Sequence, residues 1–475
     1  MTSSFGGLNT AYTGLVAARA GLTVVGDNIS NSTTVGYSRQ EVTTTSLTPA
    51  SETGFSSPVQ VGDGVSVNGV TRVNSALADA QVRSTSAADG YAQETATQMS
   101  TIESALNEPG TNGLSTSLQS FWSAWQNVST TSNSASAATS VIAAGNQVAS
   151  QLAAGYTAAA NQWTAVRGSV DTTVSTINAD ATQLASLNGQ IRSIVASGGN
   201  ANGLLDQAST LATTLSNLSG ATARVNGDGT TDILLGGNAL VSGTTVNQIA
   251  ASGASSLDGA VATPVTIGFV DNPAATAAIS GGTLGADLAM LAPANASGTG
   301  GAIAQAAAQY NTLATTLANS VNSIMQGGAT ASGTTGLSFF SITDPAHAAT
   351  SLAVIPTDST GIAAGTPGSG ASNGDVANQI AQLTTSTTGA DSQWENFVVA
   401  IGQASSSATS QASITSTGLA TATSAQSSIS AVDTDQETTN MLTYQNAFSA
   451  AARVMTTLDD MLNTLINKTG LVGIN

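Results

Sequence analysis

The chain has 475 residues, which is long enough for two or three domains with separate cores. It contains no cysteine, so disulfides, thiolate metal sites and cysteine nucleophiles are excluded. Only 9 Lys and Arg stand against 27 Asp and Glu, and the net charge of −18 argues against nucleic acid and anionic membrane surfaces as partners.

Charged residues make up only 8% of the chain, so Ala, Ser, Thr and Gly must supply much of its surface. Between Val225 and Ala452 there is no Lys or Arg. Such a neutral surface suits a subunit packed among copies of itself, and compositional drift explains it equally well. No apolar run approaches the ~18 residues of a membrane span. The N-terminus also lacks the basic start and apolar core of a cleavable signal peptide.

The first element is a helix, predicted from apolar residues that recur every three or four positions. The residues expected on this stripe are Leu8, Tyr12, Leu15, Ala18, Leu22, Val25 and Ile29. Gly14 and Gly21 lie beside it, where they would let another helix backbone come close. The stripe therefore indicates a helix with a helical neighbour, although an ordinary amphipathic helix on a globular core has the same pattern.

A Thr-rich linker or short hairpin follows, up to about Pro58. A strand with a turn at residues 62–64 is then predicted from the alternating residues Val59, Val61, Val65, Val67 and Val70. From Ser75 to about Gly220 the pattern is helical, with breaks at residues 109–110 and 198–199 and one long helix over 137–195.

Three aromatic residues, Phe121, Trp122 and Trp125, lie close together in the helical region. A sugar-stacking site is one interpretation. Their helical spacing, with no carboxylate cluster beside them, favours a role in the core.

The pattern changes near Gly220 to short apolar runs separated by Gly, Asn, Asp and Ser, which predicts a β-rich insertion ending near Pro293. The run Asn226-Gly-Asp-Gly229 is reminiscent of a calcium loop. The first and twelfth positions of such a loop would be Arg224 and Leu235, which are not calcium ligands, so a hairpin turn is predicted instead.

Helical spacing returns after residue 297 and is interrupted by a Gly-rich stretch, residues 329–373. That stretch holds the only histidine, His347, which has no matching ligand set and is expected at the surface.

The C-terminal region carries the strongest pattern, an unbroken a/d heptad typical of a coiled coil. Its residues are Met441, Tyr444, Phe448, Ala451, Met455, Leu458, Leu462 and Leu465. A second row, Ala447, Val454 and Met461, runs beside it and indicates more than one partner helix. We expect the two ends of the chain to pair with each other, and their spare apolar face to meet helices of other subunits.

The fold class expected from these elements is mainly α with a β-rich insertion, elongated, and built from discontinuous domains. Residues 1–57 and 430–475 would form a terminal coiled-coil domain with paired N- and C-terminal helices. Residues 58–219, 297–328 and 374–429 would form a helical rod, 220–296 a projecting β domain, and 329–373 a Gly-rich loop or small excursion.

Two sets of residues resemble the bacterial flagellar axial family. The first is Asn28-Ile-Ser-Asn31 followed by Gly36-Tyr37-Ser-Arg39-Gln, which is similar to the family's N-terminal signature. The second, which runs from Val432 through Glu437 to Met455, is similar to its C-terminal pattern. The Ser-Arg-Gln continuation favours the hook-associated protein 1 branch of the hook-filament junction over the rod and hook proteins.

This resemblance implies a structural axial subunit that assembles into a ring with itself. It further implies contacts with hook protein and with the second hook-associated protein or the filament side, and an export chaperone on the C-terminal region. It implies type III export without a cleaved signal peptide, to the extracellular flagellum. Residues 202–207 resemble a family motif that continues with Arg-Asp, whereas this chain has Ala208-Ser209, which puts a local ion pair in doubt.

Two other functions stay open from the sequence: a secreted adhesin, and another flagellar axial protein of the hook, rod or filament type. An enzyme such as a wall-cutting hydrolase would need paired carboxylates in a cleft, and the acids of the insertion are scattered among turns. No catalytic residue, cofactor or metal is therefore predicted.

Overall fold

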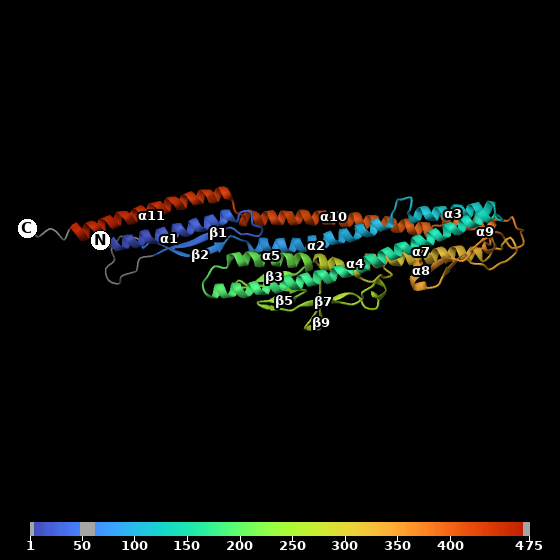
Figure 1. The fold of residues 1–475 in the computed structure, drawn as a ribbon, viewed down its shortest axis with the longest axis horizontal. Helices are drawn as coiled ribbons and strands as arrows, with labels where there is room; N and C mark the ends of the chain where they lie inside the picture. The colour runs from blue at the N-terminus through green and yellow to red at the C-terminus, as the bar shows by residue number, and fades with distance from the viewer. Residues whose placement is uncertain (1–3, 48–61, 469–475) are drawn as a thin grey trace, which may run out of the picture.

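The computed structural model describes residues 4–47 and 62–468 and shows a long, thin rod. Both described ends of the chain lie at the same end of the rod (Figure 1). The predicted strand residues Val59 and Val61 lie outside the described residues. Within the described part, none of the helices combines the length and the hydropathy of a membrane span.

The end that carries both termini is formed by helices α1 (Ser4–Ser30) and α11 (Thr434–Lys468), which pack side by side. A two-stranded antiparallel ribbon, β1 (Gln40–Ser46) and β2 (Val65–Arg72), lies against α1. This contact confirms the predicted pairing of the two chain ends. The physical reason is that each helix has a face that must be covered, and each helix covers the face of the other.

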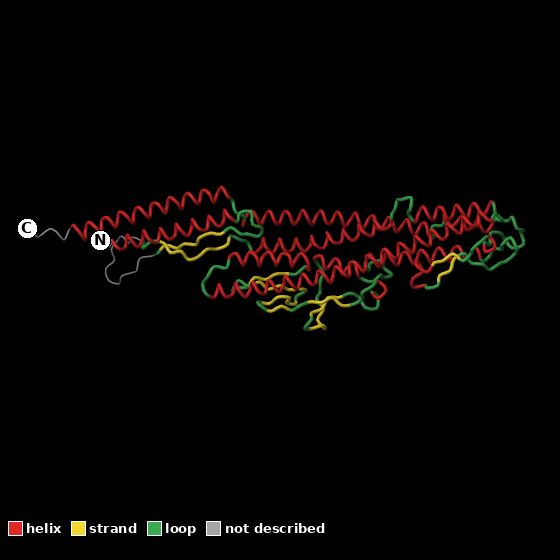
Figure 2. Tube along the Cα trace, viewed as in Figure 1, coloured by secondary structure: helices red, strands yellow, loops and turns green. Residues whose placement is uncertain are grey.

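The rod is built from helices that run along its axis (Figure 2). They are α2 (Ala76–Leu106), α3 (Leu114–Thr130), α4 (Ala135–Ala196), α5 (Asn202–Ser219), α7 (Ala302–Met325), α9 (Asp375–Ala381) and α10 (Ala390–Ser430). The long helix predicted over 137–195 corresponds to α4, which has 62 residues. Its side chains contact α3, α5 and α7, so α4 forms the spine of the rod.

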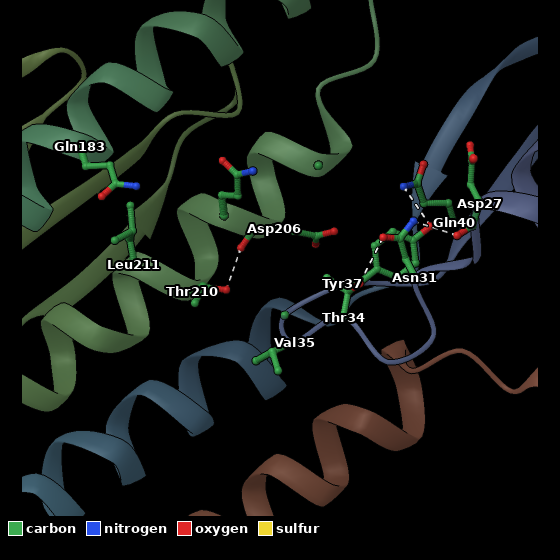
Figure 3. A pocket seen from close by; sticks show the side chains of 13 residues that line it. Asp27, Asn31, Thr34, Val35, Tyr37, Gln40, Gln183, Asp206, Thr210 and Leu211 are labelled. Atoms are coloured by element: carbon green, nitrogen blue, oxygen red, sulfur yellow. Dashed lines mark hydrogen bonds between the residues drawn. The ribbon is translucent and has the colours of Figure 1, made fainter. Parts of the chain in front are cut away.

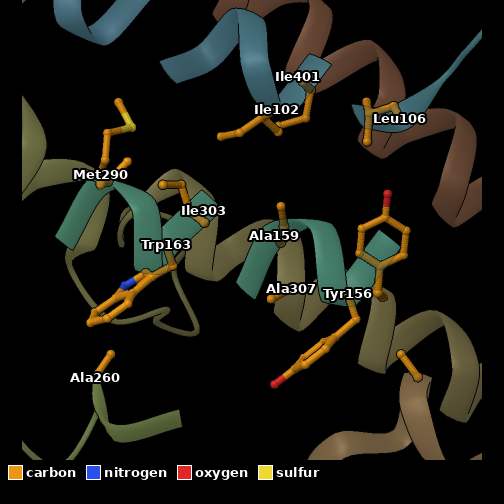
Figure 4. Close-up of a cluster of buried hydrophobic side chains, with 14 of the residues drawn as sticks. Ile102, Leu106, Tyr156, Ala159, Trp163, Ala260, Met290, Ile303, Ala307 and Ile401 are labelled. Carbon is orange, nitrogen blue, oxygen red and sulfur yellow. The ribbon is translucent and has the colours of Figure 1, made fainter. Parts of the chain in front are cut away.

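The core follows α4 along the rod. Figure 4 shows a part of it, in which Trp163 of α4 lies among Met290, Ile303 and Ala260 from three other segments. Trp163 is fully buried, and its indole NH donates to the carbonyl of Leu291 at 3.2 Å. Phe121, Trp122 and Trp125 are buried as well, which confirms their predicted core role.

The β-rich insertion packs against one side of α4 and α5. Its first sheet has the order β3 (Thr222–Val225), β4 (Thr231–Leu235), β5 (Asn238–Ser242), β6 (Thr245–Val246), and its second the order β7 (Ile249–Ser252), β8 (Thr266–Phe269), β9 (Asn272–Thr276). All pairs are antiparallel. The run from Asn226 to Gly229 is the turn between β3 and β4, as predicted.

A helix that the sequence pattern did not indicate follows the second sheet. This helix, α6 (Gly282–Leu291), packs between α2, α4 and α5 and so belongs with the rod helices. Its pattern resembles strand and turn because Gly281, Gly282 and Gly285 lie in or before its first turn and because it contains the acidic residue Asp287.

The Gly-rich stretch forms strands β10 (Phe340–Ile342) and β11 (Leu352–Val354) and the short helix α8 (Ala348–Ser351) at the far end of the rod. Phe339 and Phe340 are fully buried and pack their rings against Phe121 of α3. The stretch is therefore fastened to the rod core by these two aromatic rings.

Candidate functional site

The face of α1 that turns inward is made of small residues in heptad spacing. Its members are buried or half-buried, and they are Gly7, Ala11, Gly14, Ala18, Gly21, Val25 and Asn28. The Tyr444 ring fills the space that a side chain at Gly21 would need, and Leu458 lies 3.5 Å from where a side chain at Gly7 would begin. Because Gly7 meets Leu458 and Gly21 meets Tyr444, the two helices run antiparallel, and these two glycines each face a large residue of α11.

The predicted stripe on α1 shares Ala18 and Val25 with this face, and its other five residues lie one position further along the chain than the residues of the face. Leu8, Leu15, Leu22 and Ile29 are half-buried and Val25 is 3% exposed, but Tyr12 is 56% exposed and lies outside the contact. The predicted stripe consists mainly of large side chains, whereas close packing of two helices selects glycine and alanine. Tyr12 therefore does not contribute to the contact with α11.

The predicted seam of α11 lies on the side that faces α1. Seven of its eight residues are half-buried: Met441, Tyr444, Phe448, Ala451, Met455, Leu458 and Leu462. Leu465 is 55% exposed. The second row stays on the outside, with Val454 49% and Met461 52% exposed. The helix pair thus buries one apolar row and leaves another open to solvent.

The end of α1 is fixed to the ribbon by Asn28, which is fully buried. Its side-chain oxygen Oδ1 accepts from the Tyr37 hydroxyl at 2.9 Å and from the Gln40 backbone NH at 2.9 Å. Its amide donates to the Gln40 carbonyl at 2.9 Å. Only a side chain with both a donor and an acceptor satisfies all three groups, so aspartate or leucine would leave a buried polar group unpaired.

The other motif residues shape the loop between α1 and β1. Asn31 closes the end of α1 by donating twice to the Asp27 carbonyl. Gly36 has φ of 81°, and a side chain there would approach the Thr210 hydroxyl of α5 at 2.5 Å. The Arg39 backbone NH donates to the Ser430 carbonyl at the end of α10 at 2.7 Å. The loop therefore joins the terminal pair to the rod.

A buried ion pair, which sequence reasoning missed, completes this joint. Arg72 of β2 lies 2.7 Å from Asp206 of α5, and both side chains are less than 15% exposed (13% and 8%). The Ser38 backbone NH donates to the same carboxylate at 3.2 Å. Burial raises the pKa of Asp206, and the charge of Arg72 opposes that rise. The acid of the 202–207 motif thus pairs with a distant arginine rather than with a local one.

A hollow of about 560 Å³ lies beneath the loop (Figure 3). Asp27, Asn31 and Tyr37 line one side of it, and Asp206 and Thr210 of α5 line the other. The hydrogen bonds drawn in Figure 3 link these groups to their neighbours in the joint, among them Thr210 to the carbonyl of Asp206 at 3.1 Å. The hollow is a structural feature of the joint between the helix pair and the rod.

Two further groups of titratable residues lie in the rod. Among the described residues, no cluster of three or more His, Asp or Glu could hold a metal ion. His347 lies between Asp344 and Asp258, at 2.7 and 3.1 Å, and is 34% exposed, so it is a tethered rather than a free surface residue. Hydrogen bonds that its ring makes to the carboxylates of Asp344 and then Asp258 raise the pKa of His347.

The second group is centred on Asp287 of α6, which is fully buried. Neither of its carboxyl oxygens has a hydrogen-bond partner at normal geometry, and the side chains nearest to it are those of Glu94 and Ser169. Burial, and after it the charge of Glu94 on α2, raises the pKa of Asp287 to about 8. The group is therefore a neutral acid at neutral pH, which is how a buried carboxyl without a cationic partner is accommodated.

Comparison with known proteins gives two family matches. The flagellar hook-associated protein FlgK helical domain matches residues 99–340. The flagellar basal body rod FlgEFG protein C-terminal family matches residues 425–468, which include all of α11.

Individual relatives agree with these matches. Flagellar hook-associated protein 1 of Bacillus subtilis is 30% identical over 506 residues, covering 100% of both chains. The protein of the same name from Escherichia coli is 30% identical over 71% of this chain and 60% of its own length. A solved structure of the flagellar hook junction protein FlgK from Burkholderia pseudomallei has a TM-score of 0.62 at 17% identity, covering 74% of this chain and all of that one. The last match shows likeness of fold.

Proposed function

This chain belongs to the flagellar hook-associated protein 1 family, and we propose that it builds the hook-filament junction by packing its α1–α11 pair against the same pair of neighbouring copies. Members of the family are structural, non-enzymatic components of the extracellular flagellum, and they associate with hook and filament proteins. The finer proposal concerns which surfaces of this chain make the contacts.

The observation that carries the proposal is the one-sided burial of the helix pair. Val454 and Met461 form an exposed apolar row on α11, and Tyr12 and Val16, four residues apart, form an exposed apolar pair on α1. Exposed apolar rows of this kind mark interaction surfaces. Further copies of the same pair would cover both, which makes a closed ring of copies the natural arrangement.

The same proposal assigns a contact to the other predicted residues of α11. The seam contacts α1 of the same chain, and its members are Met441, Tyr444, Phe448, Met455, Leu458 and Leu462. The outer row contacts the neighbouring copy. An export chaperone that binds the C-terminal region would cover this row before assembly, since the row is otherwise exposed in the free chain. Asn28, Asn31, Gly36, Tyr37 and Arg39 hold the pair at a fixed angle to the rod.

The test uses isolated hooks whose distal ends are open, incubated with the purified chain and examined by electron microscopy after labelling. We expect the wild-type chain to occupy the distal end. The double variant Val454→Asp with Met461→Asp should leave it empty, because charges would be buried at the contact. Thr456→Asp, on the same helix but outside both rows, is the matched control and should bind. Equal binding by all three would reject the outer row as an assembly surface.

A further inference from the structure

An acid on α11 is buried without a counterpart. Glu437 is 2% exposed, and its Oε2 has no hydrogen-bond partner. It lines a hollow of about 240 Å³ between α1, β1 and α11, together with Gln40, Glu41, Asn440 and Tyr444. A buried carboxylate oxygen without a donor is costly for the free chain, which implies that something else supplies the donor.

The charges around the hollow define what fits. Glu41 is already paired with Arg39, at 2.9 Å, so one negative charge, that of Glu437, is left over. The remaining lining residues are amides, a phenol and apolar side chains, and no three acidic or histidine side chains among the described residues converge as metal ligands. A single positive charge that carries several donors balances such a site, and a guanidinium group has that form.

The chain itself carries exposed guanidinium groups on the same helix pair. Arg39, Arg72, Arg167 and Arg224 are engaged in ion pairs. Arg19 of α1 and Arg453 of α11 are exposed and form no ion pair within the described part of the chain. Arg453 directly precedes Val454 of the exposed apolar row, so a neighbour packed on that row would bring Arg453 into the contact.

We propose that Glu437 is the acceptor for Arg453 of a second copy of this chain, which inserts its guanidinium into the hollow between α1, β1 and α11. The two residues are sixteen positions apart on α11, or about 24 Å along the helix axis. Neighbouring copies would therefore be displaced along the axis by about that distance. This inference rests on the proposed function, since it needs a second copy packed on the first.

The first experiment separates a role between copies from one within the chain. Glu437→Gln keeps the shape and removes the charge, so the free protein should unfold at the same temperature as wild type or a higher one. Occupancy of open hook ends at limiting protein should fall about tenfold or more, as expected for the loss of a buried charge pair. Asp459→Asn, which removes an exposed acid from the same helix, is the control and should match wild type. A clear drop in the melting temperature of free Glu437→Gln would place its partner within the chain and overturn the proposal.

The second experiment identifies the partner. Arg453→Glu should lose occupancy as Glu437→Gln does, and the double variant Glu437→Arg with Arg453→Glu should regain it. Because the chain has no cysteine, Asn440→Cys and Arg453→Cys can also be placed in two separate copies and tested for a disulfide at the hook end. If occupancy returned instead in the double variant Glu437→Arg with Arg19→Glu, the partner would be Arg19, and the assignment to Arg453 would be overturned.

A metal ion is the other occupant to exclude. If Mg²⁺ or Ca²⁺ alone raised the melting temperature of the free wild-type protein but not of Glu437→Gln, the hollow would be a cation site and the proposal would be wrong. Normal junctions formed by Glu437→Gln would also refute it while leaving the proposed function intact. Absence of the wild-type chain from hook ends would instead refute the proposed function.

Discussion

The rod and the terminal helix pair are both helical, but they bury their side chains to different degrees. In the rod, Phe121, Trp125 and Trp163 are fully buried, and helices on several sides cover α4. In the terminal pair, the seam of α11 is only half-buried and α1 presents mainly glycine and alanine to it. Since stability follows the apolar area removed from water, the rod is expected to be stable in the free chain, and the pair to depend on its neighbours.

The largest effect is expected from a core residue of the rod. Trp163→Ala should reduce the free energy of unfolding by about 3 to 5 kcal/mol, because it leaves a cavity at a fully buried site. Urea denaturation followed by far-UV circular dichroism measures this. A change below about 1 kcal/mol would show that the spine is loosely packed and would remove the contrast between the two regions.

The next largest effect depends on pH. Because the folded pKa of Asp287 is about 8, well above its unfolded value, the folded chain holds a proton that the unfolded chain releases. Stability should therefore fall as pH rises from about 4 to about 8 and should level off beyond. Asp287→Asn should be less sensitive to pH and more stable than wild type at about pH 8. If the urea midpoints of the two proteins changed by the same amount across this pH range, the folded chain would not hold Asp287 as a neutral acid.

A seam residue of the terminal pair should behave in the opposite way to Trp163. Leu458→Ala should change the stability of the free chain by no more than about 1 kcal/mol, since Leu458 is only half-buried there. Its occupancy of open hook ends should nevertheless fall clearly. If Leu458→Ala unfolded the free chain as Trp163→Ala does, the pair would belong to the same cooperative unit as the rod.

The smallest effect is expected at His347. The two aspartates raise its pKa, so its pairing contributes stability below the unfolded pKa of about 6.5 and loses it as pH rises through the folded pKa. Asp258 and Asp344 are more than half exposed (61% and 51%), and solvent screens such pairs. His347→Gln should therefore lower the melting temperature slightly at about pH 6 and not at about pH 9. An equal loss at both values would point to packing instead of charge.

The elements that could be predicted from the sequence are those with long periodic patterns. The seam of α11 and the length of α4 follow directly from apolar spacing. The packing face of α1 does not follow from apolar spacing in the same way, because its residues are small, whereas the stripe of large side chains includes the exposed Tyr12. Helix α6 was hidden by its glycines and by Asp287, a charged residue type that is seldom fully buried.

The joint was predicted only in part. The sequence marks Asn28, Gly36 and Tyr37 as motif residues, but nothing in their spacing indicates that the Asn28 side chain accepts from Tyr37 and from Gln40. The pair between Arg72 and Asp206 joins residues far apart in the chain, and one sequence carries no signal for such a contact. The unsatisfied oxygen of Glu437 likewise becomes visible only when α1, β1 and α11 are placed together.

Hydrogen exchange is the most direct test of the contrast between rod and terminal pair. In the free chain, amides of α1 and α11 should exchange much faster than those of α4, since little apolar contact holds the pair. In protein assembled on hook ends, the same amides should become nearly as slow as those of α4. Slow exchange in α1 and α11 of the free chain, unchanged on assembly, would contradict the view that neighbouring copies complete this helix pair.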